Sequence, residues 1–421
     1  MICLKNGTYI EWQTFEQIPL DIWVEEGEGA SFSFKPPDNI PPNLITIDCT
    51  GRYIMRSLGN AHQHAYSALC TGMPQPEVPP ASFVETLQKI WWRVDSALDA
   101  DMIRASALVT AVAAAKSGST FVIDHHASPG FIKGSLDIIA RAFDEVGISH
   151  LLCYEITDRN GLKGAREGLA ETERYLSQRQ GLVGLHASFT VGEQTLKEAV
   201  ALARNFNTGI HVHVAEDGAD ENHCRQTYGK SVAERFAEAG VFELKGNIFA
   251  HGIHLNAIER RLIAKSDTWM AVNFDSNLNN GVGAFSGMGL GPRIMLGTDG
   301  MHGDMMASAR TAWFSGKGYE AITPARVFQR LQMIHLYLAA NKIKGNSDNN
   351  LMVLNYDSPT PLIQENFLGH WFYSLHARHI EHVIANGRLI VREGHLTTLD
   401  EAEVMAEARI QALRLWGELK N

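Results

Sequence analysis

The sequence predicts an α/β fold: a TIM-type (β/α)8 barrel with a small composite β-sandwich. Short apolar β segments alternate with helical patterns between about residues 57 and 344. Eight such units predict a parallel sheet that closes into a barrel. β-type sequence also stands before and after this region. Because each of these two outer pieces is too small to form its own core, we expect them to combine.

The N-terminal residues 1–55 contain three short β segments, "TYIEW", "LDIWVEE" and "NLITIDCTGRYIM". Gly, Pro and Asn residues separate them, and so does the proline-rich stretch "KPPDNIPPN". β sequence returns near residue 345 with "NLMVLNY" and "IEHVIANGRLIVREG", in which "ANGR" is typical of a hairpin turn. We therefore expect residues 1–55 and 345–400 to form one composite β-sandwich domain.

The barrel is expected over residues 56–344. Its first strand is the run before His62, and the other seven are residues 120–126, 148–155, 181–188, 209–216, 246–252, 268–274 and 293–300. The intervening helical patterns include residues 101–118, 135–147, 195–207, 230–240 and 256–266. The last segment, residues 401–421, has the apolar spacing of a helix that packs against a core.

Composition narrows the class of protein. The 421 residues include 37 Lys and Arg against 47 Asp and Glu, a net charge of −10, which argues against a nucleic-acid or anionic-membrane surface. No stretch approaches the ~20 apolar residues of a membrane span, and the N-terminus lacks the features of a signal peptide. Five scattered cysteines fit reduced thiols better than a disulfide framework. These features predict a cytoplasmic protein.

Histidines gather at the predicted strand ends, where barrels of this kind carry their catalytic groups. His62 and His64 follow the first strand, and an extended chain points two such residues the same way. His213 and Asp299 end two other strands. Three imidazoles and one carboxylate suit Zn²⁺ or Fe²⁺ and leave room for water. These four residues are therefore the predicted metal ligands.

Six motifs occur in order along the chain: "GNAHQHAYSAL", "GLHASFTV", "HVHVAED", "AHGIHL", "SNLNNGVG" and "LGTDG". Together they resemble the amidohydrolase superfamily, specifically its cytosine-deaminase-like and chlorohydrolase-like aminohydrolases. "IWWRVDSAL", "FVIDHHASPGFIKGSL", "CYEITDRNG" and "SPTPL" look more specifically like the aminohydrolase associated with selenium metabolism. The resemblance spans about residues 50–395 and implies the same barrel and composite β-sandwich.

The resemblance also implies roles for individual residues. His62, His64, His213 and Asp299 match the family's metal ligands. Glu216 matches its proton-shuttling glutamate, His251 the histidine beside the metal-bound water, and His186 a residue that contacts substrate. Because no lysine stands at the end of the fourth strand, a single ion is expected, zinc first and Fe(II) as the alternative. A homo-oligomer, such as a dimer, is also implied.

These residues predict a metal-dependent aminohydrolase that releases ammonia from an amino-substituted nitrogen heterocycle. The metal lowers the pKa of bound water toward neutrality, so that metal-bound hydroxide can attack. Asp299 accepts the water proton and Glu216 protonates the ring nitrogen. Two alternatives stay open: hydrolysis of a cyclic amide or a C–Cl bond at the same site, and a non-catalytic, metal-bound regulatory protein.

Several residues carry open predictions. Of the neighbours His125 and His126, at most one can face the barrel mouth. "IWWRVDSAL" is either a packed helix, a dimer contact or a substrate lid. His302 is a residue for which substrate contact is open, and Asp304 is expected to cap the next helix. Val272 stands where the family usually has histidine, so the usual substrate is not assumed.

Overall fold

The computed structural model describes residues 1–420. At its centre lies a parallel sheet in which eight strands pair in chain order, from β6 to β13. The strands are β6 (Leu58–Gln63), β7 (Ser119–His126), β8 (Ser149–Ile156), β9 (Val183–Ala187), β10 (Ile210–Val214), β11 (Asn247–His251), β12 (Thr268–Val272) and β13 (Ile294–Leu296). The backbone N–H groups of Thr298 and Asp299 donate to the carbonyl of His62 at 3.0 and 2.9 Å. These bonds join the last strand to the first, so the predicted barrel is confirmed.

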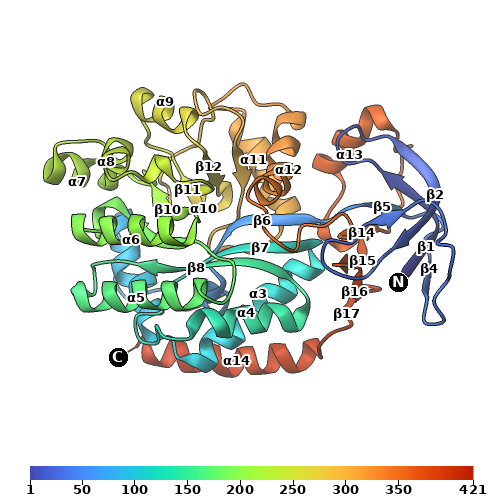
Figure 1. The fold of residues 1–421 in the computed structure, drawn as a ribbon, viewed down its shortest axis with the longest axis horizontal. Coiled ribbons are helices and arrows are strands. Elements are labelled where there is room, and N and C mark those ends of the chain that lie inside the picture. Colours follow the sequence, from blue (N-terminus) through green and yellow to red (C-terminus); the bar gives the residue numbers. More distant parts are fainter. Residues whose placement is uncertain (421) are drawn as a thin grey trace.

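Helices cover the outside of this barrel (Figure 1). They are α3 (Ala100–Lys116), α4 (Ser135–Val146), α5 (Gly161–Leu176), α6 (Glu193–Phe206), α7 (Gly218–Tyr228), α8 (Val232–Glu238), α9 (Ala257–Lys265), α11 (Met305–Gly316) and α12 (Pro324–Ala340). The short α10 (Phe274–Asn279) instead lies at the carboxyl end of the barrel, directly after β12. Asp304 caps α11 as predicted, because its carboxylate accepts from the N–H groups of Met306 and Ala307 at 2.9 and 3.1 Å.

A nine-stranded mixed sheet beside the barrel combines both ends of the chain (Figure 1). Its strands are β1 (Ile2–Ile10), β2 (Gln17–Val24), β3 (Phe32–Ser33), β4 (Ile45–Asp48), β5 (Tyr53–Arg56), β14 (Leu351–Leu354), β15 (Ile380–Ala385), β16 (Arg388–Arg392) and β17 (His395–Leu396), and α13 (Phe367–Tyr373) lies beside them. Ile47, Ile54, Val353 and Ile384 share one buried core, so residues from both ends of the chain fill it together. The hairpin predicted at "ANGR" joins β15 to β16.

The first strand differs from its prediction. "TYIEW" placed it at residues 8–12, whereas β1 runs from Ile2 to Ile10. Asn6 and Gly7 resemble a turn in the sequence, but the pairing of β1 with β2 shifts register between Leu4 and Gly7. Asn6 takes a positive φ of 59° at this bulge. A bulge lets the strand continue through residues that otherwise end one.

Side chains on the barrel strands alternate between two apolar layers. Phe121, Ile123 and Ala271 belong to the inner core of the barrel. Val122 and Val272, which are neighbours of these residues in the chain, belong to the larger core between the strands and the outer helices. Because successive strand residues face opposite ways, this alternation decides which side chains at a strand end reach the barrel mouth.

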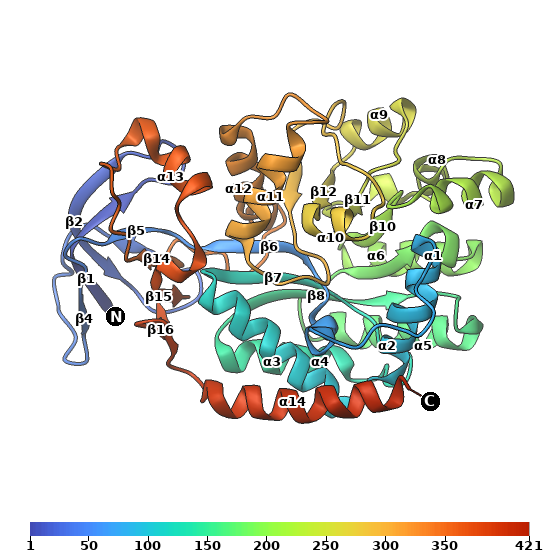
Figure 2. The same ribbon diagram turned by 180° about the vertical axis from the view of Figure 1, so that it is seen from behind.

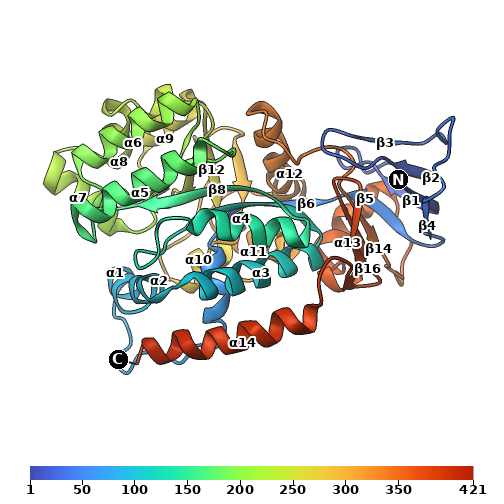
Figure 3. The same cartoon turned by 60° about the horizontal axis from the view of Figure 1, so that its bottom comes forward.

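Two further segments of the chain, one after β6 and one at the end, complete the fold around the barrel. After β6 the chain forms a 3₁₀ turn, η1 (Ala65–Cys70), then α1 (Phe83–Thr86), a π-helical turn, η2 (Leu87–Trp91), and α2 (Trp92–Ala97). The final helix, α14 (Glu401–Glu418), runs along α3, and its end lies close to α2 (Figures 2 and 3). Within residues 1–420, no helix has the length and apolar character needed to span a bilayer.

Candidate metal centre and active site

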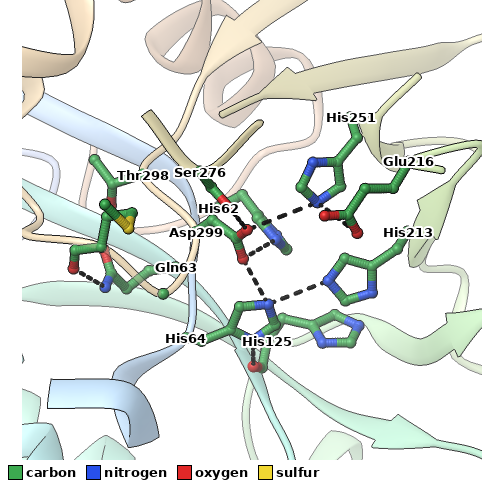
Figure 4. Close-up of polar contacts among 12 residues, drawn as sticks. His62, Gln63, His64, His125, His213, Glu216, His251, Ser276, Thr298 and Asp299 are labelled. Carbon is green, nitrogen blue, oxygen red and sulfur yellow. Dashed lines mark hydrogen bonds and ion pairs between the residues drawn. The ribbon is translucent and has the colours of Figure 1, made fainter. Parts of the chain in front are cut away.

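The four predicted metal ligands meet at the carboxyl end of the barrel (Figure 4). His64 Nε2 lies 2.9 Å from Asp299 Oδ1 and 3.1 Å from His213 Nε2. His62 Nε2 lies 3.4 Å from the same Asp299 oxygen. The barrel therefore brings together side chains that are as many as 237 residues apart, since residues 62 and 299 end adjoining strands.

Hydrogen bonds at Nδ1, the ring nitrogen that faces away from the cluster, fix the orientation of two of these imidazoles. His64 Nδ1 lies 2.6 Å from the carbonyl oxygen of His125, and His213 Nδ1 lies 2.7 Å from that of His186. Because a carbonyl oxygen only accepts, each Nδ1 carries the proton and donates. Each ring then turns its Nε2 toward the cluster. Metal-binding histidines are commonly oriented in this way.

The chemistry of the cluster fits a divalent metal ion. The Nε2 atoms of His62 and His251 are buried and have no hydrogen-bond partner. Leaving a buried polar atom unpaired is costly, and a cation would satisfy both. Donor atoms of His62, His213, His251 and Asp299 all lie within 4.8 Å of one another. Imidazole and carboxylate donors in this number suit zinc or ferrous iron.

One histidine of this compact group differs from the predicted ligand set. The group contains His251, whereas the prediction has His64. His251 Nε2 faces Glu216 Oε2 at 3.5 Å and Asp299 Oδ2 at 3.9 Å. His64 Nε2 lies closer to the Asp299 carboxylate, at 2.9 Å. The predicted four-ligand set therefore stays a prediction, with His64 and His251 as the residues to distinguish.

Two of the predicted ligand histidines and the aspartate are in the states that metal binding needs. Burial lowers the pKa of His62 to about 3 and holds the pKa of His213 well below its usual value. Both rings are consequently neutral at pH 7 and can donate a lone pair. Burial opposes ionisation of Asp299, but the neighbouring His62 and His64 rings hold the pKa of this carboxyl well below its ordinary range. At His64 burial is outweighed by the Asp299 carboxylate, which raises the pKa of the ring to about 9, so His64 would release a proton on binding a metal.

Glu216 stands directly beside the cluster, just after β10. Burial raises its pKa to about 7 against the attraction of His251, and the negative Asp299 raises it further. A carboxyl with such a pKa can both give and take a proton near neutral pH. The turn before it is held by Asp220, whose carboxylate accepts from the N–H groups of Ala215 and Phe189 at 3.0 Å each.

A cavity of about 60 Å³ lies beside the cluster. His64, His213 and Asp299 line it on one side. Trp91 and Trp92, from the predicted lid motif, are also among its lining residues. The structure therefore places this motif at the cavity, as the lid interpretation requires, and it also packs the same residues into helical turns.

The other predicted histidines have different places. His186 lines the cavity, and its Nδ1 lies 2.6 Å from the hydroxyl of Thr190. His125 faces the barrel interior, with Nε2 3.1 Å from the carbonyl oxygen of Leu185. His126 instead contacts the hydroxyl of Ser128 at 2.8 Å. As the alternation of strand residues predicts, only one of the adjacent pair faces inward.

Two residues that the sequence left open are not among those that line the cavity. Val272 lies in the outer core between strand and helices, so the absent family histidine removes no contact inside the barrel. His302 accepts from the N–H of Asp304 at 2.9 Å and lies 3.7 Å from Asp275, at the start of α11.

Sequence reasoning missed three residues that contact the cluster residues. The Ser276 hydroxyl donates to Asp299 Oδ2, and Asn277 Oδ1 lies 2.8 Å from His251 Nδ1. Both belong to the motif "SNLNNGVG", which was noted only as part of a resemblance. His211 Nε2 lies 2.9 Å from His62 Nδ1. Its position two residues before His213 places both rings on one face of the strand, a pattern that could have revealed it.

The match to a known family agrees with this geometry. Residues 53–390, most of the chain, match the model for the amidohydrolase family. This chain belongs to the amidohydrolase family. The narrower resemblance to the selenium-associated aminohydrolase stays a prediction.

Several characterised proteins are similar to it along most of their length. A 5-methylthioadenosine/S-adenosylhomocysteine deaminase of Desulforudis audaxviator is 25% identical over 94% of both chains. A 5'-deoxyadenosine deaminase of Methanococcus vannielii is 27% identical over 88% of this chain and 90% of its own. The zinc-bound adenosine deaminase of Xanthomonas campestris has a TM-score of 0.82 at 17% identity, covering 98% of both chains. This last likeness, at so low an identity, concerns the fold.

This family and these relatives identify an enzyme class. The protein is a metal-dependent hydrolase that acts on non-peptide carbon–nitrogen bonds. The cluster of histidines and one aspartate is consistent with the divalent metal that such an enzyme uses.

Proposed function

We propose that this protein is a zinc-dependent deaminase that removes the amino group of a small nitrogen heterocycle such as an aminopurine. The observation that carries the proposal is the position of Glu216, whose carboxyl lies 3.5 Å from His251 beside the cavity and the cluster. The relatives that carry deaminase names support the same reaction. The proposal includes a single small-molecule substrate, a cytoplasmic location and a homo-oligomer.

The metal is assigned to His62, His64, His213 and Asp299. When bound, a divalent ion supplies the Lewis acidity that brings the pKa of a water molecule toward neutrality. Asp299 accepts a proton from the attacking water, and the hydroxyl of Ser276, which donates to Asp299 Oδ2, orients this carboxylate. His251, oriented by Asn277 at its Nδ1, points Nε2 toward the same place and can stabilise developing negative charge.

Glu216 moves the proton on the substrate. Its carboxyl gives a proton to the ring nitrogen while the water oxygen bonds to the neighbouring carbon that carries the amino group. The amino nitrogen then takes up the proton held by Asp299, the added hydroxyl gives its proton to the Glu216 carboxylate, the carbon–nitrogen bond breaks, and ammonia leaves. Both carboxyl groups thereby regain their starting states. The two carboxyl groups thus divide the acid and base roles, as positioned proton transfer requires.

The experiment that tests the proposal measures metal and products together. The purified protein is analysed for zinc and iron and assayed with amino-substituted purines, pyrimidines, pterins and triazines for ammonia, chloride and ring-opened acids. We expect about one equivalent of zinc and ammonia as the product. Chloride or a ring-opened acid without ammonia would replace the deaminase proposal with one of the alternatives, and binding without any hydrolysis would favour a regulatory protein.

A further inference from the structure

The cavity beside the cluster has an unusual balance of charge. Four carboxylates line it, those of Asp95, Glu155, Glu216 and Asp299. Among residues 1–420, no lysine or arginine is part of this lining. A site built for a phosphate or carboxylate normally offers a cationic side chain to it. The lining instead combines these carboxylate acceptors with three imidazoles, those of His64, His186 and His213.

Arg159 is the cation nearest to Glu155 in the fold, and it already forms an ion pair with another residue. Its guanidinium pairs with the buried carboxylate of Asp95, and it packs against the ring of Trp92 with its central carbon 5.2 Å from the ring centroid. Its side chain is only 6% exposed. Arg159 therefore holds α2 to the end of β8 and is not free to meet an anionic ligand.

Glu155 is the carboxylate that the proposed reaction does not use. It stands on β8, the third strand, across the closed barrel from β12, the seventh. Its side chain is only 4% exposed, yet its contacts are long: 3.4 Å to His125 Nδ1 and 3.8 Å to Arg159. These distances exceed those of ordinary hydrogen bonds. A buried carboxylate with so little direct pairing keeps acceptor capacity for a ligand.

We infer that the enzyme selects substrates that carry no anionic group, and that Glu155 sets this selection by accepting hydrogen bonds from N–H or O–H donors of the substrate. The inference rests on the proposed function and narrows its substrate class to neutral or cationic heterocycles and nucleosides. A phosphate or carboxylate brought into this cavity would face like charge with little water to screen it. A hydroxyl, amine or ring N–H would instead find an acceptor.

Two adenine nucleosides and one nucleotide, which differ at the 5' position, test this directly. The metal-replete full-length protein is assayed for ammonia release from adenosine, from 5'-amino-5'-deoxyadenosine and from adenosine 5'-monophosphate. We expect the kcat/KM of the neutral and cationic compounds to exceed that of the monophosphate by about 100-fold or more. Equal or better use of the monophosphate would overturn the inference.

A pair of variants assigns the effect to Glu155. Glu155→Gln keeps the size of the side chain and removes its charge, and we expect it to shrink the preference at least tenfold. Glu167→Gln changes an exposed carboxylate on α5 that pairs with Lys163 at 3.7 Å, and we expect no change. An unchanged preference in a folded Glu155→Gln protein would refute the role of Glu155. If that variant does not fold, the comparison of the three compounds on the unaltered protein still decides the selection.

Binding measurements separate this inference from the proposed function. If none of the three compounds releases ammonia, the adenine-directed deaminase proposal fails. Titration calorimetry of the same three compounds against the metal-replete protein then tests charge selection alone. Tighter binding of adenosine and its 5'-amino derivative than of the monophosphate supports the inference, and equal or tighter binding of the monophosphate contradicts it.

Discussion

Three residues at the site hold backbone conformations that L-amino acids rarely adopt. Ala215, His251 and Asp299 have φ angles of 46°, 70° and 57°, in the left-handed region where the side chain crowds the backbone. Each stands at or just after the end of a barrel strand, where the chain turns abruptly into the site. Strain of this kind costs about 1–3 kcal/mol per residue. Surrounding contacts, such as the bond from Ala215 N–H to Asp220, offset this cost.

The role of Glu216 can be separated from metal binding. Glu216→Gln keeps the shape of the side chain but cannot give and take a proton, so we expect turnover to fall by about 10³-fold. Metal content should stay the same, as measured by elemental analysis beside the ammonia assay. The exposed Glu238→Gln serves as the control and should retain full activity. Loss of metal from Glu216→Gln would make Glu216 a ligand instead.

The two histidines that compete for the ligand set can be distinguished in the same way. We expect His64→Ala to lose bound metal, because its Nε2 is 2.9 Å from Asp299 and directed at the cluster. His251→Ala should keep about one equivalent of metal while turnover falls by about 100-fold or more. The reverse pattern of metal contents would place His251 in the ligand set and His64 beside it.

At the scale of elements, the final helix contacts both α2 and the turn that follows His64. Trp416 Nε1 donates to the carbonyl of Leu69, in the turn that follows His64, at 2.9 Å. Arg93 of α2 donates to the carbonyl of Leu419, and Arg414 pairs with Asp99 at 2.5 Å. α14 therefore stabilises the segment that lines the cavity, in addition to packing against α3.

The buried pair of Asp95 and Arg159 holds α2 in place. Asp95→Asn leaves the Arg159 guanidinium without its charged partner, an arrangement that is strongly unfavourable in a protein interior. We expect faster amide hydrogen exchange over residues 83–97 and a KM raised about tenfold. The control is Glu145→Gln, which breaks an exposed ion pair in which the Glu145 carboxylate lies 2.8 Å from the guanidinium of Arg104. Unchanged exchange over the segment would show that other contacts hold it.

A pair of glutamates between α7 and α9 makes stability depend on pH. Burial raises the pKa of Glu221 to about 8, from an ordinary 4.5, and a hydrogen bond with Glu259 adds to the effect. The folded state thus holds a proton that the unfolded state releases, and this contribution to stability is lost as pH rises toward and through 8. Glu221→Gln replaces the carboxyl with an amide that does not titrate, so the variant does not lose this stability at high pH. The quantity to compare is the Tm of the variant minus the Tm of the unaltered protein. We expect this difference to be about 2 °C larger at pH 8.5 than at pH 6.

Calorimetric scans at the two pH values measure this difference directly. Glu238→Gln, an exposed carboxylate, should show the same Tm difference at both pH values. A Glu221→Gln difference that does not vary with pH would mean that the pair does not share a proton.

At the scale of the whole molecule, one ion would join strands from all parts of the barrel. The predicted ligands come from β6, β10 and the end of β13, so metal binding stabilises only the closed, folded sheet. Ligand present at about a thousand times its Kd adds about 4 kcal/mol. We therefore expect chelation to abolish turnover and to lower Tm by several degrees, and zinc to restore both. A Tm unaffected by chelation would contradict this placement of the ligands.

The barrel and its element boundaries were predictable because local patterns carry them. Of the seven parallel strands whose bounds were predicted, six begin and end within two residues of those observed, and α3, α4, α6, α8 and α9 agree as closely. The exception is β13, which ends at Leu296, where the apolar residues end, although the predicted strand extends to residue 300. Beyond Leu296 the chain leaves the sheet and turns into the site at Asp299.

The sequence by itself determined the barrel and which strand-end residues could form the cluster. It did so for two reasons. Successive strand residues face opposite sides of the sheet, so the position of a residue in a strand predicts the side that it faces. Catalytic groups of such barrels also lie at the carboxyl ends of the strands. Only the tertiary structure decided what surrounds that cluster. Ser276 donates a hydrogen bond to Asp299, Asn277 contacts His251, and Val272 lies in the outer core, away from the cavity. The tertiary structure also decided that Asp95 engages Arg159 and leaves Glu155 facing the cavity. These contacts join loops far apart in the chain, and no local pattern specifies how such loops pack.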